Sequence, residues 1–457
     1  MNYDEFIESK ALITESNGFT FEVSELNPKL FTFQKDIVRW ALARGRAAIF
    51  AGCGLGKTAM QLEWAEKIRN KTGGKVLIVA PLAVSTQTKR EGEKFGIAVN
   101  ICASQADVVT DKLNITNYEK LDHFIGKEFT AVVLDESSIL KSYSGKVRNM
   151  IIEMFRRTPY KLACTATPAP NDNMELGNHS EFLGIMNRSE MLSMFFVHDG
   201  GETSKWRLKG HAESEFWKWL SSWSVVVDNP VDLGYTDVDY TLPELQINQI
   251  VVDGKAPYTT TLSLTERRNA RRESLELRCQ AAADLVNNSD EQWLVWCDLN
   301  DESDRLHELI NNSINVQGSD SPDHKANAII NFAESKLHCL ITKPTIAGFG
   351  INWQNCHNVI FVGLSDSYEQ YYQAIRRCWR FGQKYPVNTY IIISAKEGTV
   401  KANIERKDAD NNKFRKELVA LTRDITKREL TSASRMFTEY KPTETMILPK
   451  WEEFKNV

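Results

Sequence analysis

The sequence has no excess of basic residues, although it carries many charges. Its 56 Lys and Arg residues are outnumbered by 60 Asp and Glu residues, which gives a formal net charge of −4. A protein that covers a polyanion with a broad basic surface shows that surface in its composition. The charge balance therefore excludes that mode of binding, and any cationic surface for DNA or RNA must be local.

Patterns typical of zinc sites, disulfide frameworks and membrane segments are also missing. None of the eight cysteines pair as CxxC and no histidine lies at zinc-finger spacing, so we expect free thiols and no structural zinc. The start, MNYDEFIESK, has no apolar signal-peptide core, and no run approaches the ~20 apolar residues of a membrane helix. These absences predict a soluble, cytoplasmic protein with no membrane partner.

The sequence does contain a recurring alternation of short apolar runs with polar, helix-like stretches. Near-continuous apolar strands between helices are typical of a parallel sheet with both faces covered. We expect one set of strands at residues 46–50, 76–80, 131–134 and 161–164, and a second set at residues 293–297, 337–342, 358–362 and 388–393.

The two sets of strands predict an α/β protein of two lobes. The connector is expected near residues 230–250, where Pro, Asp and Gly are frequent. We assign an N-terminal segment, two lobes and a helical tail to residues 1–29, 30–240, 241–410 and 411–457. A Trp-rich helical element near residues 206–223 allows two interpretations: rings that stack on bases, or packing of an accessory helix on the first lobe, which we favour.

A glycine-rich stretch, AGCGLGKT at residues 51–58, follows the first expected strand and begins a helix. Apart from its first Ala it fits the P-loop pattern, in which glycines let backbone N–H groups turn towards phosphates. Those glycines are Gly52, Gly54 and Gly56. Lys57 adds a positive charge, Thr58 offers a hydroxyl to Mg²⁺, and the helix N-terminus adds its dipole. The stretch predicts a site for ATP with Mg²⁺.

An acidic pair, Asp135 and Glu136, follows the expected strand at residues 131–134. The carboxyl edge of a parallel strand is where a nucleotide-bound Mg²⁺ is held in P-loop proteins. We therefore expect Asp135 to hold the ion and Glu136 to polarise the attacking water.

These two stretches resemble motifs I and II of the superfamily-two helicases and translocases. DESS at residues 135–138 stands where DEAD or DEAH is usual, which changes the link that the fourth residue makes to other motifs. The surrounding LDESSILKSYSGK resembles the phage and prophage branch nearest the Snf-type DNA translocases. Other stretches resemble the remaining motifs in order: LFTFQ at 30–34 (Q), APL at 80–82 (Ia), ITNY at 115–118 (Ib), TATP at 165–168 (III), TIAGFGINW at 345–353 (V) and QAIRRCWRFGQ at 373–383 (VI).

The resemblance implies tandem RecA-like lobes, each a mainly parallel sheet flanked by helices, with ATP in the cleft between them. Gln34 would then recognise the adenine edge through its amide. Arg377 and Arg380 would act as arginine fingers on the γ-phosphate, and Gln373 would position water or sense the phosphate. Because only a closed cleft makes those contacts, ATP would close it and hydrolysis would reopen it.

The resemblance also implies a nucleic-acid strand held by both lobes, through sequence-independent contacts to its backbone. The candidates from motifs Ia, Ib and V are Ser85, Thr116, Asn117, Lys343 and Gly348. A separate basic stripe pairs Arg267 with Arg271 at helical spacing. Its alternative interpretation, an ion-paired helix, stays open because acidic residues lie close by.

The function expected is an ATP-dependent DNA helicase or translocase that unwinds, branch-migrates or remodels DNA in phage replication, recombination or repair. It would work in the cytoplasm of the bacterial host, with a small accessory protein as a further partner. Two alternatives are an RNA helicase and a nucleic-acid-binding module without turnover. The Snf-like motif VI argues against the first, and the intact motif I, II and VI residues argue against the second.

Overall fold

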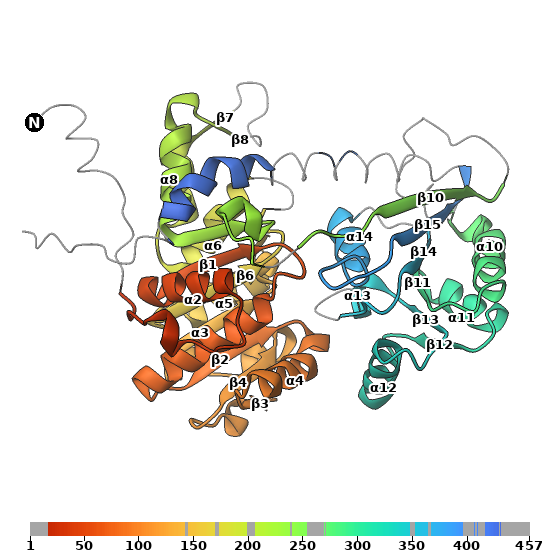
Figure 1. Cartoon of the computed structure of the whole chain (residues 1–457), viewed down its shortest axis with the longest axis horizontal. Coiled ribbons are helices and arrows are strands. Elements are labelled where there is room, and N and C mark those ends of the chain that lie inside the picture. The colour runs from red at the N-terminus through yellow and green to blue at the C-terminus, as the bar shows by residue number, and fades with distance from the viewer. Residues whose placement is uncertain are drawn as a thin grey trace, which may run out of the picture.

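The computed structural model describes residues 17–141, 145–169, 173–198, 206–237, 240–253, 271–347, 352–363, 367–395 and 416–428, with single residues beside them. Two α/β bodies lie side by side, each built on its own parallel sheet (Figure 1). The predicted fold class is confirmed. The eight cysteines are free thiols, as expected. Within the described ranges, no helix is long and apolar enough to cross a lipid bilayer.

Lobe 1 is built on a seven-stranded parallel sheet in the order β3-β4-β2-β5-β6-β1-β9. Its strands are β1 (Arg46–Ala51), β2 (Val76–Ala80), β3 (Val99–Ile101), β4 (Leu113–Asn117), β5 (Ala131–Asp135), β6 (Tyr160–Thr165) and β9 (Ser224–Val227). The four expected strands are present. The prediction missed β3, β4 and β9, which are short or carry polar residues that break the apolar run.

Successive strand residues point to opposite faces of a sheet, so lobe 1 has two apolar cores. One core joins the face that includes Ile49 and Ile78 to α2 (Thr32–Arg44) and α3 (Lys57–Thr72), with α4 (Ser85–Phe95) beside them. The other core joins the face that includes Phe50 and Val79 to helices from the second part of the lobe. Those helices are α5 (Lys146–Met154), α6 (Leu176–Leu183), α7 (Arg188–Phe195) and α8 (Glu213–Trp223).

The Trp-rich element packs on lobe 1. It consists of α8 and a hairpin of β7 (Phe196–His198) and β8 (Trp206–Leu208). Trp217, Trp219 and Trp223 are buried in the core that contains Phe50. This placement agrees with the packing interpretation, because these rings are not available to bases.

Lobe 2 is built on a six-stranded parallel sheet in the order β10-β15-β14-β11-β13-β12. Its strands are β10 (Leu245–Val251), β11 (Trp293–Cys297), β12 (Ser313–Val316), β13 (Cys339–Thr342), β14 (Asn358–Val362) and β15 (Val387–Ile393). α10 (Leu275–Asn287) and α11 (Asn300–Leu309) cover one face. The other face is covered by α12 (Pro322–Ala333), α13 (Pro344–Ala347) and α14 (Tyr368–Ile375). β10 begins inside the expected connector; it is an edge strand with polar residues, so its sequence has no continuous apolar run.

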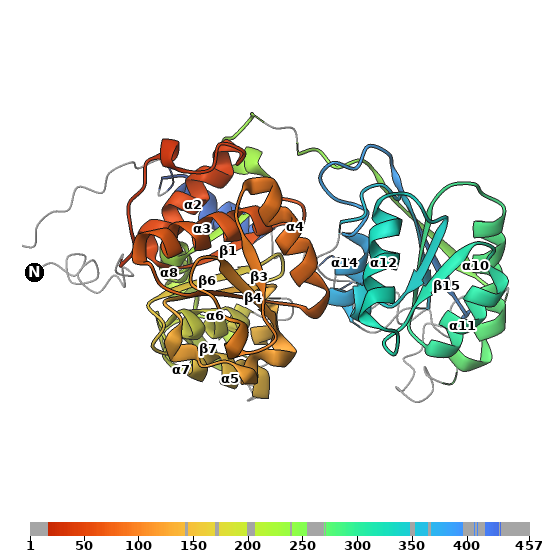
Figure 2. The same ribbon diagram turned by 90° about the horizontal axis from the view of Figure 1, so that it is seen from below.

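A helix at residues 416–428, after the lobe 2 sheet, lies on lobe 1 (Figure 1). Its Leu418 and Val419 belong to the lobe 1 core that contains α8, and Arg39 of α2 donates a hydrogen bond to Leu430 O at 3.0 Å. Seen from below, α4 of lobe 1 faces α12 and α14 of lobe 2 across the boundary (Figure 2). Because the helix at residues 416–428 lies on lobe 1 again, the chain passes between the lobes twice, once before β10 and once after β15.

Candidate nucleotide site at the lobe boundary

The P-loop joins β1 to α3, as its sequence predicts. Gly54 (φ 90°) and Gly56 (φ 78°) have left-handed backbones that other residues rarely adopt. A β-carbon at Gly56 would also lie 2.3 Å from Gln34 Nε2. Lys57 Nζ donates to Ala51 O at 3.0 Å and so lies over the loop. The loop therefore has the glycine-dependent turns expected of a P-loop, and phosphate binding by its N–H groups and Lys57 stays a prediction.

Gln34 braces this loop. Its side chain is buried, its Nε2 donates to Leu55 O at 2.9 Å, and its Oε1 accepts from Phe31 N at 3.0 Å. Both ends of the amide are therefore engaged within lobe 1. Recognition of adenine by Gln34 stays a prediction.

The acidic pair lies at the carboxyl end of β5, and both side chains are buried. Burial, with the nearby charge of Glu136 as a second cause, raises the pKa of Asp135 to about 6. Glu136 has φ 52°, an uncommon conformation for a residue with a side chain. Such backbone strain is characteristic of functional sites. Two buried carboxylates side by side suit a divalent cation, which takes oxygen ligands and would relieve their repulsion.

Lobe 1 residues outside the expected set hold Asp135. Gln61 Nε2 donates to Asp135 Oδ1 at 2.7 Å, and the Tyr118 hydroxyl donates to Asp135 O at 2.7 Å. Gln61 carried a usable signal, because it lies one helical turn after Lys57 on the same face of α3. Tyr118 approaches from the end of β4, and only the tertiary fold shows its role.

Two further contacts hold Glu136 and the residue after it. Thr165 Oγ1 donates to Glu136 Oε2 at 3.4 Å, which ties motif III to motif II. His179 of α6 lies 3.1 Å from Ser137 Oγ through its Nε2 and packs edge-on against Phe50. Burial lowers the pKa of His179 to about 4, so this imidazole is neutral at physiological pH. A histidine from another helix therefore contacts motif II, whose own fourth residue is serine.

The candidate arginines follow α14 in lobe 2. Arg377 is buried, and its Nε and Nη2 donate to Gln373 O and Gln373 Oε1 at 2.9 and 2.8 Å. Burial, and then the charge of Arg377, lowers the pKa of Arg380 to about 10, which leaves it cationic at neutral pH. Gln373 is thus the orienting partner of Arg377, and a contact from Gln373 to water or phosphate stays a prediction.

Motif VI meets the P-loop across the lobe boundary. A β-carbon at Gly54 would lie 2.9 Å from Phe381 N and 3.5 Å from Arg380 Cβ. The Phe381 ring lies 4.3 Å from that of Tyr240. An ion pair between Lys141, just after motif II, and Glu369 of α14 also joins the lobes. The arginine segment of one lobe therefore adjoins the phosphate loop of the other.

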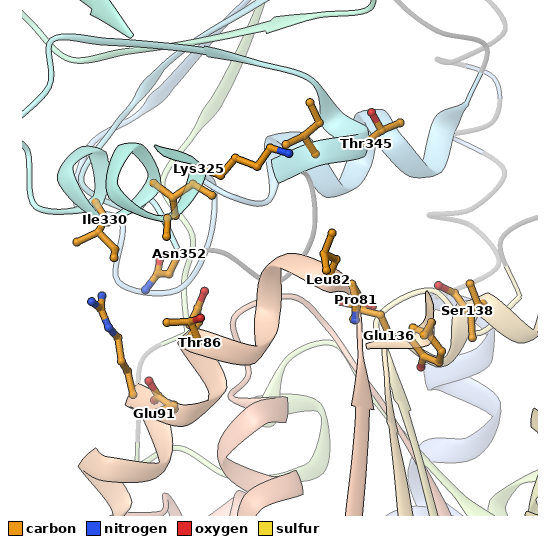
Figure 3. A pocket seen from close by; sticks show the side chains of 18 of the residues that line it. Pro81, Leu82, Thr86, Glu91, Glu136, Ser138, Lys325, Ile330, Thr345 and Asn352 are labelled. Atoms are coloured by element: carbon orange, nitrogen blue, oxygen red, sulfur yellow. The ribbon is translucent and has the colours of Figure 1, made fainter. Parts of the chain in front are cut away.

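Beside this contact, the boundary opens into a cleft of about 1440 Å³. Leu82, Thr86 and Glu91 face it from lobe 1, and Lys325 and Asn352 from lobe 2 (Figure 3). Glu136 and Ser138 also line it, so it reaches motif II. The P-loop is not among its described lining residues. Its lining has seven Lys and Arg side chains against five Glu, which is a local cationic excess.

The candidate nucleic-acid residues lie next to this lining rather than in it. Ser85, Thr116 and Asn117 are buried, while their neighbours Thr86 and Tyr118 line the cleft. Lys343 is partly exposed between β13 and α13, close to the lining residue Thr345.

The basic stripe is described only in part. Arg271 is buried, and its Nη1 lies 2.7 Å from Asp298 Oδ2. This ion pair favours the alternative interpretation for Arg271. Arg267 and Gly348 lie outside the described residues.

Comparisons with known proteins match each lobe separately. Two protein-family models match the chain. The family described as "Type III restriction enzyme, res subunit" matches residues 28–170, and the family described as "Helicase conserved C-terminal domain" matches residues 277–382. The Bos taurus protein named "DNA annealing helicase and endonuclease ZRANB3" is 28% identical over 166 residues, which cover 33% of this chain and 15% of that protein. The chain therefore spans a small part of that relative's length.

Among solved structures, the Sulfolobus solfataricus SWI2/SNF2 ATPase core in complex with dsDNA is similar with a TM-score of 0.43 and 16% sequence identity. The match covers 91% of this chain and 100% of the other.

Proposed function

We propose that the chain is an ATP-driven DNA helicase or translocase of superfamily two, in its Snf-like branch, because two family models match its two lobes in the expected order and a part of it is 28% identical to a DNA annealing helicase. One observation carries the proposal: Arg380 and Phe381 of lobe 2 lie against Gly54 in the P-loop of lobe 1. A phosphate bound by the P-loop would therefore lie near Arg380, a buried, cationic arginine of the other lobe. Such a split site couples nucleotide state to lobe position.

Lobe 1 supplies the residues that bind ATP and direct the attacking water. Bound ATP with Mg²⁺ supplies the transferable phosphoryl group and the charge that neutralises it. The P-loop N–H groups and Lys57 bind the phosphates, and Thr58 and Asp135 hold the ion. Glu136, fixed by Thr165, orients and polarises water.

Lobe 2 completes the site. Arg377, clamped by Gln373, and Arg380 stabilise the negative charge that develops during phosphoryl transfer. Because both arginines belong to lobe 2, this stabilisation exists only when the lobes are held together. Loss of the γ-phosphate removes the contact that favours closure, and the lobes separate.

The cleft between α4 and α12 is the proposed path for DNA. Its volume and mixed lining suit a sugar–phosphate backbone held by a few cations, hydroxyls and backbone amides. Ser85, Thr116, Asn117 and Lys343 remain proposed contacts beside it, and Gly348, outside the described residues, remains a candidate from the sequence alone. With a small local excess of cations, binding weakens steadily as salt rises. A role in phage replication, recombination or repair, with an accessory protein partner, rests on the motif II resemblance.

The decisive experiment measures ATP hydrolysis with single-stranded DNA, duplex, a fork, a four-way junction and RNA. Stimulation by DNA supports the proposal, and selective stimulation by junctions assigns branch migration. Stimulation by RNA alone would make the protein an RNA helicase. Hydrolysis that no nucleic acid stimulates would overturn the motor function. Lys57→Ala is the control that separates this activity from a contaminant.

A further inference from the structure

Gln61 is a buried amide to which the sequence motifs assign no role. It lies in α3 and is 1% exposed. Its Nε2 donates to Asp135 Oδ1 at 2.7 Å, whereas its Oε1 has no hydrogen-bond partner among the described residues. Burying an amide oxygen without a partner is destabilising. An apolar residue would pack at this position without that cost, so the amide needs an explanation beyond packing.

We propose that Gln61 is a positioning residue that fixes the Asp135 carboxylate for the cation accompanying the nucleotide. The proposal rests on the proposed ATPase function. Gln61 Nε2 and Glu136 N both donate to the same oxygen, Asp135 Oδ1, at 2.7 and 3.1 Å. Two donors on one oxygen stop rotation of the carboxylate. The second oxygen, Oδ2, is then held in one direction.

The chemistry of an amide suits this task better than a charged group. A lysine at position 61 would neutralise Asp135 and repel the cation. A glutamate would add a third buried carboxylate and would lack the N–H donor. A neutral donor orients the carboxylate and leaves its negative charge for the ion, as outer-shell partners of metal ligands commonly do.

The position of Gln61 in α3 also links it to the phosphate-binding residues. The same helix begins at Lys57 and carries Thr58 in its first turn. A rigid helix therefore sets the distances between the phosphate charge, the hydroxyl proposed for Mg²⁺ and the donor that holds Asp135. Any shift of α3 moves all three together, which keeps the ion site in register with the P-loop.

The test compares Gln61→Met with wild type, because Met preserves volume and removes the donor. Binding of a fluorescent ADP, N-methylanthraniloyl-ADP, is measured as Mg²⁺ is varied and again in EDTA. Removal of such an outer-shell partner typically weakens metal affinity ~10–100-fold. We expect the Mg²⁺ needed for half-maximal enhancement to rise by that factor, with affinity in EDTA unchanged. Mn²⁺ binding followed by electron paramagnetic resonance gives the same comparison without turnover.

Two further variants keep the result interpretable. Gln61→Asn retains an amide that is one methylene too short, so it should also raise the Mg²⁺ requirement if Gln61→Met does not fold. Ile68→Val, in the same helix and also buried, should leave that requirement unchanged. In an Asp135→Asn background, adding Gln61→Met should have no further effect.

Three results would overturn the assignment. They are an unchanged Mg²⁺ requirement in a folded position-61 variant, an equal loss in EDTA, and additive effects with Asp135→Asn. Wild-type protein that binds the nucleotide with no Mg²⁺ dependence would instead overturn the proposed function, so the two failures are distinguishable.

Discussion

The two lobes share a parallel sheet with helices on both faces, but they build their parts of the site differently. Lobe 1 holds its carboxylates by hydrogen bonds from within the lobe, such as Gln61 to Asp135 and Thr165 to Glu136. Lobe 2 places its arginines in a short segment after α14 that lies at the boundary itself. The lobe 1 half is complete on its own, whereas the lobe 2 half acts only through contact.

This difference separates binding from turnover. Under the proposed function, we expect the residues assembled inside lobe 1 to supply most of the nucleotide affinity. We expect the lobe 2 arginines to affect the rate of the chemical step instead, and so to depend on closure of the lobes. Variants in the two lobes should therefore give different kinetic signatures, which the following experiments examine.

The largest effect is expected for Arg380→Ala. Loss of an arginine finger lowers kcat by ~10³–10⁵-fold in this class of reaction. Nucleotide affinity should change little, because the P-loop and Asp135 remain in place. Turnover and fluorescent-nucleotide binding are measured side by side with Lys57→Ala, which should lose affinity as well as turnover. If Arg380→Ala loses affinity as severely as Lys57→Ala, the separation of roles is wrong.

The next largest effect is expected on the stability of lobe 2, which contains a buried ion pair. Arg278 of α10 and Glu302 of α11 form an ion pair at 2.7 Å, with both side chains 0% exposed. Glu302→Gln removes the negative charge that pairs with the buried Arg278, and breaking a buried ion pair typically costs ~3–5 kcal/mol. We expect lobe 2 to unfold first in a calorimetric scan, with the lobe 1 transition unchanged. Replacing the exposed Glu308 by Gln is the matched control, and equal scans for both variants would refute the prediction.

Lobe 1 contains the opposite case, a buried lysine that forms no ion pair with a carboxylate among the described residues. Lys161 Nζ donates to Phe182 O at 2.8 Å, and burial, followed by the charge of Arg46, lowers its pKa to about 7. Between pH 7 and the ordinary lysine range, the unfolded chain binds a proton that the folded chain does not. The contribution of Lys161 to the free energy of unfolding therefore rises with pH in that window, by at most ~1.4 kcal/mol per pH unit.

Lys161→Met removes this dependence. We expect the stability of wild type relative to Lys161→Met to increase from pH 7 to pH 10, as measured by urea unfolding followed by tryptophan fluorescence. The difference between the two proteins cancels the contribution of every other titrating group. A difference that stays constant over this range would show that Lys161 is charged in the folded protein.

The smallest effect is expected at the ion pair between the lobes. Lys141 is partly exposed, and such pairs contribute ~0–1 kcal/mol. Glu369→Lys should lower nucleic-acid-stimulated turnover by a few-fold, and Lys141→Glu combined with Glu369→Lys should restore it. No recovery in the double variant would show that the pair does not set the position of lobe 2.

The sequence predicts the parts of the site whose conformation depends on residues that are neighbours in the chain. The P-loop lies between a strand and a helix that both show in the apolar pattern, and Asp135 ends a strand of continuous apolar residues. β10 and β12 escaped prediction because edge strands carry polar side chains. The contacts of Phe381 with Gly54 and of His179 with Ser137 join residues far apart in the chain. No pattern within one segment encodes such pairs, so only the tertiary fold reveals them.

The helix at residues 416–428 has a consequence for how far lobe 2 can travel. The chain enters lobe 2 at β10, and beyond β15 the helix at residues 416–428 lies on lobe 1 through Leu418 and Val419. The segments before and after lobe 2 are thus both attached to lobe 1. Such a double tether keeps the arginine segment at a high effective concentration near the P-loop. In the ATP cycle proposed above, reclosure would then be a short intramolecular search rather than a new encounter.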